Sequence, residues 1–344
     1  MLRTWLLGAA TLLASLAFAS SARAEDKVLN LFAWSEYVPQ AVIDGFTKET
    51  GVKVNYETYA SNEEMLTKLL SGAAQYDLVQ PSEYTIEAMI KKDLLAPLEK
   101  TKLPNLKNLA PEFTKLGHDP DMKYCVTWMA GTVGIVVNTD KVKDDIKGYK
   151  DVFQPKFAGK IVTLDDPREL VTWVMNTKGL PINDVNDKVL AEVKPTLAEW
   201  MKLIKIYDSD SPKTALENGD VILGVVWSGE AAKLYQKDKK FKYILPAEGA
   251  HMFIDSLAIP KGAPHKDNAH AFINYILRPE VSKLISDEFP YTNPNAEARK
   301  LLSPEELANP ASYPPGSPKL ELFHDIGKAS ADVDKLVTDL KSGG

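Results

Sequence analysis

Residues 28–59, VLNLFAWSEYVPQAVIDGFTKETGVKVNYETY, contain two different hydrophobic patterns. The apolar, β-branched and aromatic runs at the two ends predict strands over Val28–Trp34 and Val52–Tyr59. The amphipathic pattern between them predicts a helix over Val38–Lys48. Because a strand, a helix and a second strand in this order form a βαβ unit, the stretch predicts an α/β fold.

The same alternation continues along the chain. Ser61 and Glu64 have capping-box spacing at the start of a helix predicted over Glu63–Leu70. The further predicted strands are Tyr76–Val79, Gly131–Asn138, Lys160–Leu164, Val221–Trp227, Tyr243–Leu245 and Phe253–Ile259, and the further predicted helices are Tyr84–Leu95, Thr196–Tyr207, Ala269–Leu277, Val281–Asp287 and Ala329–Leu340. A Pro-, Lys- and Asn-rich stretch near 97–125 separates two α/β units, and no Gly/Ser-rich linker joins them. We therefore expect two lobes connected by strands, with a ligand cleft between them. The Pro-rich stretch 309–318 is expected to be a surface connection.

Composition excludes several classes of protein. The 344 residues are 44% hydrophobic and 26% charged, which is typical of globular proteins. The net charge is −6, and it becomes −8 without the first 24 residues, which carry two arginines and no acid. This acidic balance argues against nucleic acid as a partner. The single cysteine, Cys125, excludes a disulfide within the chain, so a hydrophobic core must supply the stability.

The amino terminus predicts a cleaved signal peptide over Met1–Ala24. Arg3 precedes an apolar stretch from Trp5 to Ala19, and Ala22-Arg23-Ala24 has the small-x-small pattern of a cleavage site. The apolar stretch is shorter than a membrane-spanning helix needs, and no cysteine near the cut offers a lipid anchor. We therefore expect an exported protein without a membrane anchor.

Aromatic and acidic residues follow the predicted strands. Ligands of open α/β sheets bind at the carboxyl ends of the strands. The residues that gather there are Trp34, Ser35, Glu36, Tyr37, Ser82, Tyr84, Asp166, Glu169 and Trp227, and Asp255 lies within an apolar strand. Aromatic faces attract cations, and carboxylates accept charge-assisted hydrogen bonds, so this combination indicates an organic ammonium ligand. Several carboxylates favour a ligand with more than one positive charge.

Each of these residues also has a structural interpretation. Trp34 and Trp227 can belong to the core, and Glu36 and Glu169 can be solvated acids at helix starts. Asp166 can be an N-cap that precedes Pro167 at the first helical position. Asp255 can belong to a structural ion pair. These alternatives remain open at the level of the sequence.

Catalytic and metal-binding motifs are absent from the sequence. It contains no GxSxG, GxxxxGK[ST], GxGxxG or HExxH motif. The histidines have no metal-ligand spacing, and Cys125 has no CxxC partner and is expected to be a packed thiol. We expect no metal, no cofactor and no enzymatic activity. The alternative from another class is a secreted hydrolase that uses Asp166 and Glu169 as an acid/base pair.

Several long segments carry a resemblance to a known family. The segments are LFAWSEYVP at 31–39, YDLVQPSEY at 76–84, LDDPRE at 164–169, NGDVILGVVWSG at 218–229 and IDSLAIP at 254–260. With them, essentially the whole mature chain resembles the periplasmic spermidine/putrescine-binding proteins of ABC importers. The resemblance implies a two-lobed type II periplasmic binding protein fold, with lobe 1 at 25–136 and 256–305 and lobe 2 at 137–255 and 306–344. It also implies a periplasmic monomer that binds a polyamine and delivers it to a permease in the inner membrane.

The resemblance also implies the residues of the site. The family's aromatic box corresponds to Trp34, Tyr37, Tyr84, Trp227 and Tyr291. Its acidic contacts correspond to Glu36, Asp166, Glu169 and Asp255. Its small polar contacts correspond to Ser35, Ser82 and Ser209. Phe253 stands where spermidine-binding members have Trp, and Phe323 stands where they have Gln. Phe is a weaker platform for cations than Trp, and loss of the amide removes one acceptor for an amine. These departures leave the number of recognised amines open and admit another small organic cation, such as agmatine or an amino-acid-like amine.

Overall fold

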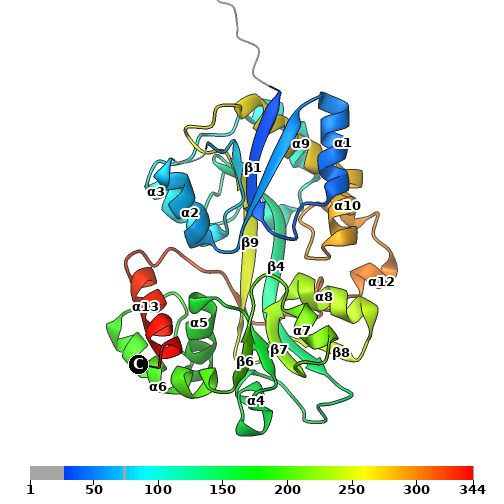
Figure 1. Ribbon diagram of the computed structural model, residues 1–344. Coiled ribbons are helices and arrows are strands. Elements are labelled where there is room, and N and C mark those ends of the chain that lie inside the picture. Colours follow the sequence, from blue (N-terminus) through cyan, green and yellow to red (C-terminus); the bar gives the residue numbers. More distant parts are fainter. Residues whose placement is uncertain (1–26, 73–74, 344) are drawn as a thin grey trace, which may run out of the picture.

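The computed structural model describes residues 27–72 and 75–343. The predicted signal peptide, Met1–Ala24, lies outside the described residues. Figure 1 shows two lobes, one above the other, with two long strands running between them. The strand order β2-β1-β3-β9-β4-β7-β5-β6 continues from one lobe into the other.

The first lobe, drawn uppermost, holds the βαβ unit predicted from residues 28–59 (Figure 1). Its strand β1 pairs in parallel with both β2 and β3. Its elements are β1 Val28–Trp34, α1 Gln40–Thr50, β2 Lys53–Tyr59, α2 Asn62–Ser71, β3 Leu78–Val79, α3 Glu83–Lys91, α9 Lys266–Ile276 and α10 Pro279–Glu288. Ser61 is the N-cap of α2, because its Oγ accepts from the Glu64 N–H at 3.1 Å. The Glu64 carboxylate accepts from the Ala60 N–H at 3.0 Å and not from the Ser61 N–H, so the start of the helix is confirmed but the reciprocal half of a capping box is not formed. The carboxyl ends of β1 and β3 point toward the other lobe.

The second lobe repeats the α/β arrangement around β5, which pairs in parallel with both β6 and β7. Its elements are α4 Tyr149–Val152, β5 Ile161–Thr163, α5 Pro167–Lys178, α6 Asp187–Met201, β6 Ile204–Tyr207, α7 Lys213–Glu217, β7 Leu223–Trp227, α8 Ser228–Lys237, β8 Phe241–Ile244 and α13 Ala329–Lys341. A helix follows directly after β7 and shortly after β5, so the ends of these strands are also helix starts. This geometry brings side chains from strand ends and helix starts toward the first lobe.

Two strands connect the lobes, β4 Cys125–Asn138 and β9 Ala250–Ala258. β4 pairs with β9 as far as Thr132, and from Val133 onward it pairs with β7 and then also with β8. All residues of β4 are buried. The lobe boundaries predicted at 136/137 and 255/256 fall inside these two strands and stay predictions.

The remaining elements are short. They are the 3₁₀ helices η1 Lys100–Lys102, η2 Pro104–Asn108, η3 Pro111–Phe113 and η4 Pro155–Phe157, the helices α11 Ala296–Arg299 and α12 Pro304–Leu307, and the strand β10 Leu320–Glu321. Three of the 3₁₀ helices lie in the Pro-, Lys- and Asn-rich stretch near 97–125, which leads into β4. Cys125 is buried, as expected of a packed thiol.

Two expectations from the sequence are wrong. The helix predicted over Thr196–Tyr207 ends at Met201, and Ile204–Tyr207 form β6, because the open edge of β5 supplies a hydrogen-bonding partner there. The Pro-rich stretch 309–318 is not confined to the surface. Its residue Ala311 is 1% exposed and packs in the hydrophobic cluster beneath α8.

Candidate functional site

A cavity lies between the two lobes, and its wall combines aromatic rings with a few polar and acidic groups, as is typical of small-molecule sites. The structure brings all of the predicted site residues to its wall: Trp34, Ser35, Glu36, Tyr37, Ser82, Tyr84, Asp166, Glu169, Ser209, Trp227, Phe253, Asp255 and Tyr291. Phe323, which the resemblance placed at a site position, also lines the cavity. The sequence-based selection did not include five further lining residues: Ala60, Asn62, Asp210, Glu230 and His251. Residues from both lobes therefore line one cavity.

The apolar part of the wall is a series of aromatic rings in contact. Trp227 meets Phe253 edge to face with centroids 5.4 Å apart, and Phe253 meets Tyr291 in the same way at 5.8 Å. Tyr37 continues the series beyond Tyr291 at 5.1 Å. Trp34, at the end of β1, adds a ring from the first lobe. Rings from both lobes thus face a ligand that enters the cavity.

Two glycines make room for two of these rings. A Cβ at Gly131 of β4 would lie 2.3 Å from Cζ of Phe253, and a Cβ at Gly229 of α8 would lie 2.4 Å from the ring of Tyr291. Both distances are far below van der Waals contact. The rings can occupy their positions only because these residues lack a side chain.

Asp255 lies in the middle of the cavity wall on β9 and is 2% exposed. The hydroxyl of Ser82 donates to its Oδ1 at 2.7 Å and the hydroxyl of Tyr37 donates to its Oδ2 at 3.0 Å. Burial raises the pKa of this carboxyl to about 7, although the two hydrogen bonds oppose the shift. No Lys, Arg or His of the described residues forms an ion pair with it, so the structural ion pair considered from the sequence is not formed.

Asp166 precedes α5 and is its N-cap, because its Oδ1 accepts from the Glu169 N–H at 3.0 Å and Pro167 begins the helix. The capping role was one of two interpretations open from the sequence, and both hold, because the same residue lines the cavity. Burial, with the charges of Glu169 and Glu63, raises the pKa of Asp166 to about 7. Within the described part of the chain, Asp166 also has no cation in an ion pair.

Glu169 differs from these two acids because a histidine neutralises it. His251 of β9 places Nδ1 2.5 Å from Oε1 of Glu169 and Nε2 3.2 Å from Oε1 of Glu83. The other oxygen of Glu169 accepts from Nε1 of Trp173 at 2.9 Å. Burial opposes the charge of His251, but Glu169 and Glu83 outweigh it and raise the pKa of His251 to about 9. His251 is therefore a buried cation at neutral pH.

Glu36 follows β1 and also has protein cations as partners. Its backbone is in the left-handed region, with φ of 52°, which is unusual for a residue other than glycine. Nζ of Lys213 lies 2.8 Å from Oε2 of Glu36 and 2.8 Å from Oε2 of Glu230, and Nζ of Lys233 lies 3.6 Å from the same Glu36 oxygen. Glu36 is thus half-exposed and ion-paired, not simply a solvated acid at a helix start.

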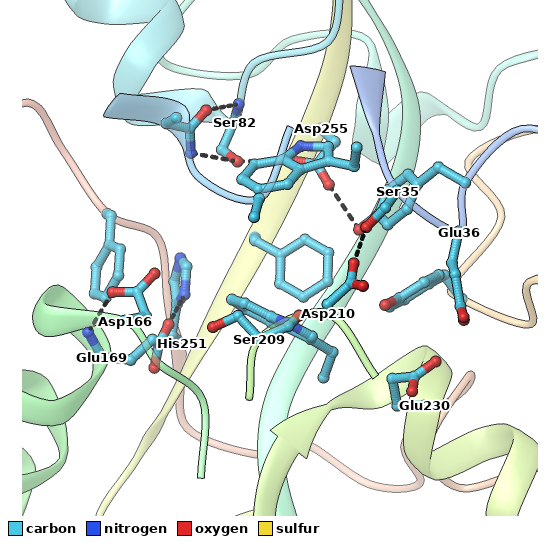
Figure 2. A pocket seen from close by; sticks show the side chains of 18 of the residues that line it. Ser35, Glu36, Ser82, Asp166, Glu169, Ser209, Asp210, Glu230, His251 and Asp255 are labelled. Carbon is cyan, nitrogen blue, oxygen red and sulfur yellow. Dashed lines mark hydrogen bonds and ion pairs between the residues drawn. The ribbon is translucent and has the colours of Figure 1, made fainter. Parts of the chain in front are cut away.

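Figure 2 shows how the acids divide around the cavity. Asp166 and Glu169 lie with His251 on the left, Glu36 and Glu230 lie on the right, and Asp255 lies between the two groups at the top of the view.

The predicted serines hold other groups in place. The hydroxyl of Ser35 donates to Asp210 across the cavity, and the hydroxyl of Ser82 donates to Asp255 (Figure 2). Oγ of Ser209 accepts from the Asp165 N–H at 2.8 Å, and its carbonyl accepts from Nε1 of Trp227 at 2.9 Å. The serines therefore position two acids, a loop and a ring.

His251 is a site residue that the sequence analysis missed. His251, Phe253 and Asp255 alternate along β9, and residues two apart in a strand share a face. This alternation is the sequence signal that could have placed His251 on the same face of the strand as Phe253 and Asp255. The ionic contacts of Lys213, Glu83 and Glu230 join elements from distant parts of the chain and had no signal in the spacing.

Neither metal binding nor membrane crossing has support in the described residues. Across residues 27–72 and 75–343, no group of three or more His, Cys, Asp and Glu side chains is arranged to hold a metal ion. Within the same ranges, no helix combines the length and apolar character needed to cross a bilayer.

Comparisons with known proteins agree with this architecture. Residues 41–314 match the family described as bacterial extracellular solute-binding protein. The spermidine/putrescine-binding periplasmic protein of Salmonella typhimurium is 37% identical over 94% of both chains, and the putrescine-binding periplasmic protein of Escherichia coli is 35% identical over 87% of this chain and 86% of its own. A solved structure of a putative spermidine/putrescine ABC transporter from Listeria monocytogenes is 32% identical, with a TM-score of 0.88, over 92% of this chain and all of that one. The predicted type II periplasmic binding protein fold is confirmed. This chain belongs to the bacterial extracellular solute-binding proteins, in the group of the spermidine/putrescine-binding proteins.

Proposed function

We propose that the protein captures a polyamine of the spermidine and putrescine class between its lobes and delivers it to an ABC importer. One observation carries the proposal. Asp166 and Asp255 line an aromatic cavity and have no protein cation as a partner in the described residues, whereas Glu36, Glu169 and Glu230 do. Partly or fully buried carboxylates without a cation are costly unless a ligand supplies the charge.

The expected binding energy is sufficient for capture. Each charge-assisted hydrogen bond contributes about 1.5–3 kcal/mol. Each cation–π contact adds about 0.5–2 kcal/mol. Two ammonium groups at Asp166 and Asp255, with an alkyl chain between the rings, can supply about 8 kcal/mol after ordering and desolvation costs, which corresponds to a micromolar Kd.

Closure of the lobes follows from the distribution of these contacts. Asp166 belongs to the second lobe, Trp34 to the first, and Asp255 to a strand that connects them. Only a closed arrangement offers all of these groups to one ligand, so the ligand favours the closed state. That state is the one a permease would recognise.

Location and partners are proposed from the relatives and the amino terminus. The relatives are named periplasmic proteins that bind spermidine or putrescine. Together with the signal peptide predicted over Met1–Ala24, these names support a periplasmic protein that meets its permease at the inner membrane.

A binding role is favoured over hydrolysis. In an acid/base pair made of Asp166 and Glu169, both carboxyl groups would have to be free to exchange protons with a substrate. Both oxygens of Glu169 are engaged, one by His251 and the other by Trp173, and the neighbouring Asp166 caps α5. These contacts hold Glu169 as a paired charge that is not free to exchange a proton with a substrate, so the acid/base pair lacks one member and we propose that the protein is not an enzyme.

The decisive experiment is a calorimetric titration of the mature protein with putrescine, spermidine, spermine and agmatine, with tryptophan fluorescence recorded in parallel. We expect micromolar or tighter binding of a polyamine, a fluorescence change from Trp34 and Trp227, and unchanged ligand after recovery. Failure to bind any of these amines would refute the proposal. Selective binding of agmatine would move the ligand to another class of organic cation.

A further inference from the structure

We propose that Lys213 is a built-in cation that neutralises two carboxylates of the cavity wall, Glu36 and Glu230, and so limits the ligand to two ammonium groups. This inference rests on the proposed function and deepens it, because it specifies a diamine of the putrescine class. It makes Lys213 a residue that determines specificity through the two carboxylates that it holds.

The surroundings of Lys213 are those expected for a ligand amine. Its Nζ lies 2.8 and 3.0 Å from the two oxygens of Glu230, 2.8 Å from Glu36 and 2.8 Å from Oγ of Ser211. Glu36 and Glu230 line the cavity, although Lys213 itself reaches them from α7 behind the wall. The side chains of Lys213 and Glu230 are only 14% and 5% exposed. A buried ammonium is therefore already bound by one carboxylate from each lobe.

The position of this cation relative to the other acids suggests its effect on the ligand. Glu36 and Glu230 lie on the side of the cavity opposite Asp166, and Asp255 lies between them (Figure 2). A triamine that places ammonium groups at Asp166 and Asp255 would direct its third ammonium toward Glu36 and Glu230. The positive charge of Lys213 would repel that third ammonium. Without Lys213, the ammonium would find two carboxylates free to bind it.

The charges around the cavity support this count. Lys213 and Lys233 balance Glu36 and Glu230, and His251 is shared by Glu169 and Glu83. Asp210 also lines the cavity, but it is exposed, accepts a hydrogen bond from Ser35, and is screened by solvent. Among the described residues that line the cavity, Asp166 and Asp255 are left as the two sheltered carboxylates without a cation in an ion pair, which matches two ammonium groups.

A purely structural role for Lys213 makes a different prediction. Lys213 links Glu36 of the first lobe to Glu230 of the second, so it also favours closure in general. Loss of closure energy would weaken putrescine and spermidine binding by the same factor. Loss of a competing cation would change the ratio of the two dissociation constants, and that ratio is the discriminating quantity.

The test is calorimetry with putrescine and spermidine on the wild-type protein and on Lys213→Met. We expect the ratio of the spermidine Kd to the putrescine Kd to fall at least tenfold in Lys213→Met. In the double variant Lys213→Met/Glu230→Gln, which removes the buried carboxylate as well, we expect most of that gain to disappear. Lys237→Met is the matched control, because Lys237 is exposed and pairs with Glu217 within the second lobe. If Lys213→Met does not fold, Lys213→Gln removes the charge and keeps a donor for Glu230.

An unchanged ratio, or an equal weakening of both ligands, would overturn the inference and leave the proposed function intact. A gain for spermidine that persists in the double variant would also overturn it, because the gain would not depend on the vacated carboxylate. A wild-type protein that binds neither amine would refute the proposed function, and this inference with it.

Discussion

The hydroxyl of Tyr37 donates a hydrogen bond to Oδ2 of Asp255 at 3.0 Å, although 218 positions separate the two residues. Tyr37 follows the first strand of the first lobe, and Asp255 lies on β9, which connects the lobes. With the hydroxyl of Ser82, Tyr37 supplies the only hydrogen bonds to this carboxylate among the described residues. Asp255 is thus held in a fixed orientation, and its negative charge is left for a ligand.

The first prediction concerns Asp255→Asn. We expect polyamine affinity to fall at least tenfold, about 1.4 kcal/mol, because the ligand loses a buried ionic partner. Calorimetry with putrescine measures the effect. Asp145→Asn is the matched control, since Asp145 is exposed and forms its ion pair with the neighbouring Lys147. Unchanged affinity in a folded Asp255→Asn protein would remove Asp255 from the site.

The same variant should be more stable without ligand at neutral pH. The pKa of Asp255 is raised to about 7 in the folded protein, so between about pH 4 and 7 the folded state binds more protons than the unfolded state. Its contribution therefore makes stability fall as pH rises through that window. Urea unfolding should show Asp255→Asn to be the more stable protein at pH 8, with the advantage shrinking toward pH 4.

The fold could be predicted from the sequence wherever local pattern and tertiary context agree. Val28–Trp34 is a buried strand with a clear pattern, and its predicted bounds are those of β1. Ile204–Tyr207, in contrast, lies within the helix predicted over Thr196–Tyr207 and is a strand in the structure. The segment becomes a strand only because the edge of β5 is next to it in space. Whether such a segment pairs with the edge of a sheet depends on residues that are far from it in the sequence.

The candidate site also could be predicted from the sequence only in part. Residues at strand ends, such as Trp34 and Asp166, could be found from position and residue type. The chemical state of the acids could not, because it depends on which cation each acid meets. Glu36 and Asp166 look alike in the sequence, yet Lys213 neutralises Glu36 and no described cation pairs with Asp166. Ion pairs between side chains of separate elements produce no periodic pattern in the sequence.

The second prediction is a pH dependence of binding. Asp166 and Asp255 have pKa values raised to about 7, and a diammonium ligand favours their ionised forms. Putrescine affinity should therefore fall from pH 7.5 to pH 6, by about tenfold if one carboxylate titrates and by more if both do. Binding at pH 7 should release protons, which calorimetry in buffers of different ionisation enthalpy detects. A flat affinity between these pH values, with no proton release, would contradict the assigned roles, and Asp255→Asn should reduce the release.

The third prediction concerns His251, which lies between Glu83 and Glu169 and stacks on Phe323 with centroids 3.6 Å apart. Its pKa is raised to about 9 in the folded protein, so its stabilising contribution is complete below about pH 6.5 and is lost as pH rises through about 9. At pH 6, His251→Gln should lower the free energy of unfolding by about 3 kcal/mol or more, because two buried carboxylates lose their cation.

Denaturant unfolding between pH 6 and 10 measures this contribution. The difference between wild type and His251→Gln should shrink at the alkaline end. His324→Gln is the control, since the side chain of His324 is largely exposed and pairs with Glu87. Parallel stability curves for wild type and His251→Gln would show that His251 does not carry the buried charge.

The last prediction concerns the space that Gly131 leaves for a ring. In Gly131→Ala the new Cβ would lie 2.3 Å from Cζ of Phe253 and 2.8 Å from Oγ of Ser228. Because β4 is fully buried and Gly131 pairs directly with Phe253 of β9, the ring must move, and the cavity is the space open to it. We expect at least a tenfold loss of putrescine affinity. Gly117→Ala is the control, because nothing lies within 4 Å of a Cβ at Gly117.

A second substitution separates displacement of the ring from general damage to the core. Phe253→Leu in the Gly131→Ala background removes the ring atoms that clash, and it should recover part of the affinity by clearing the cavity. The double variant also lacks the aromatic ring of Phe253 and the cation–π contact that the ring can make, which is worth about 0.5–2 kcal/mol. The recovery of putrescine affinity should therefore be incomplete. If the double variant binds no better than Gly131→Ala, the loss comes from β4 itself. The fit between Gly131 and Phe253 would then not be what keeps the cavity open.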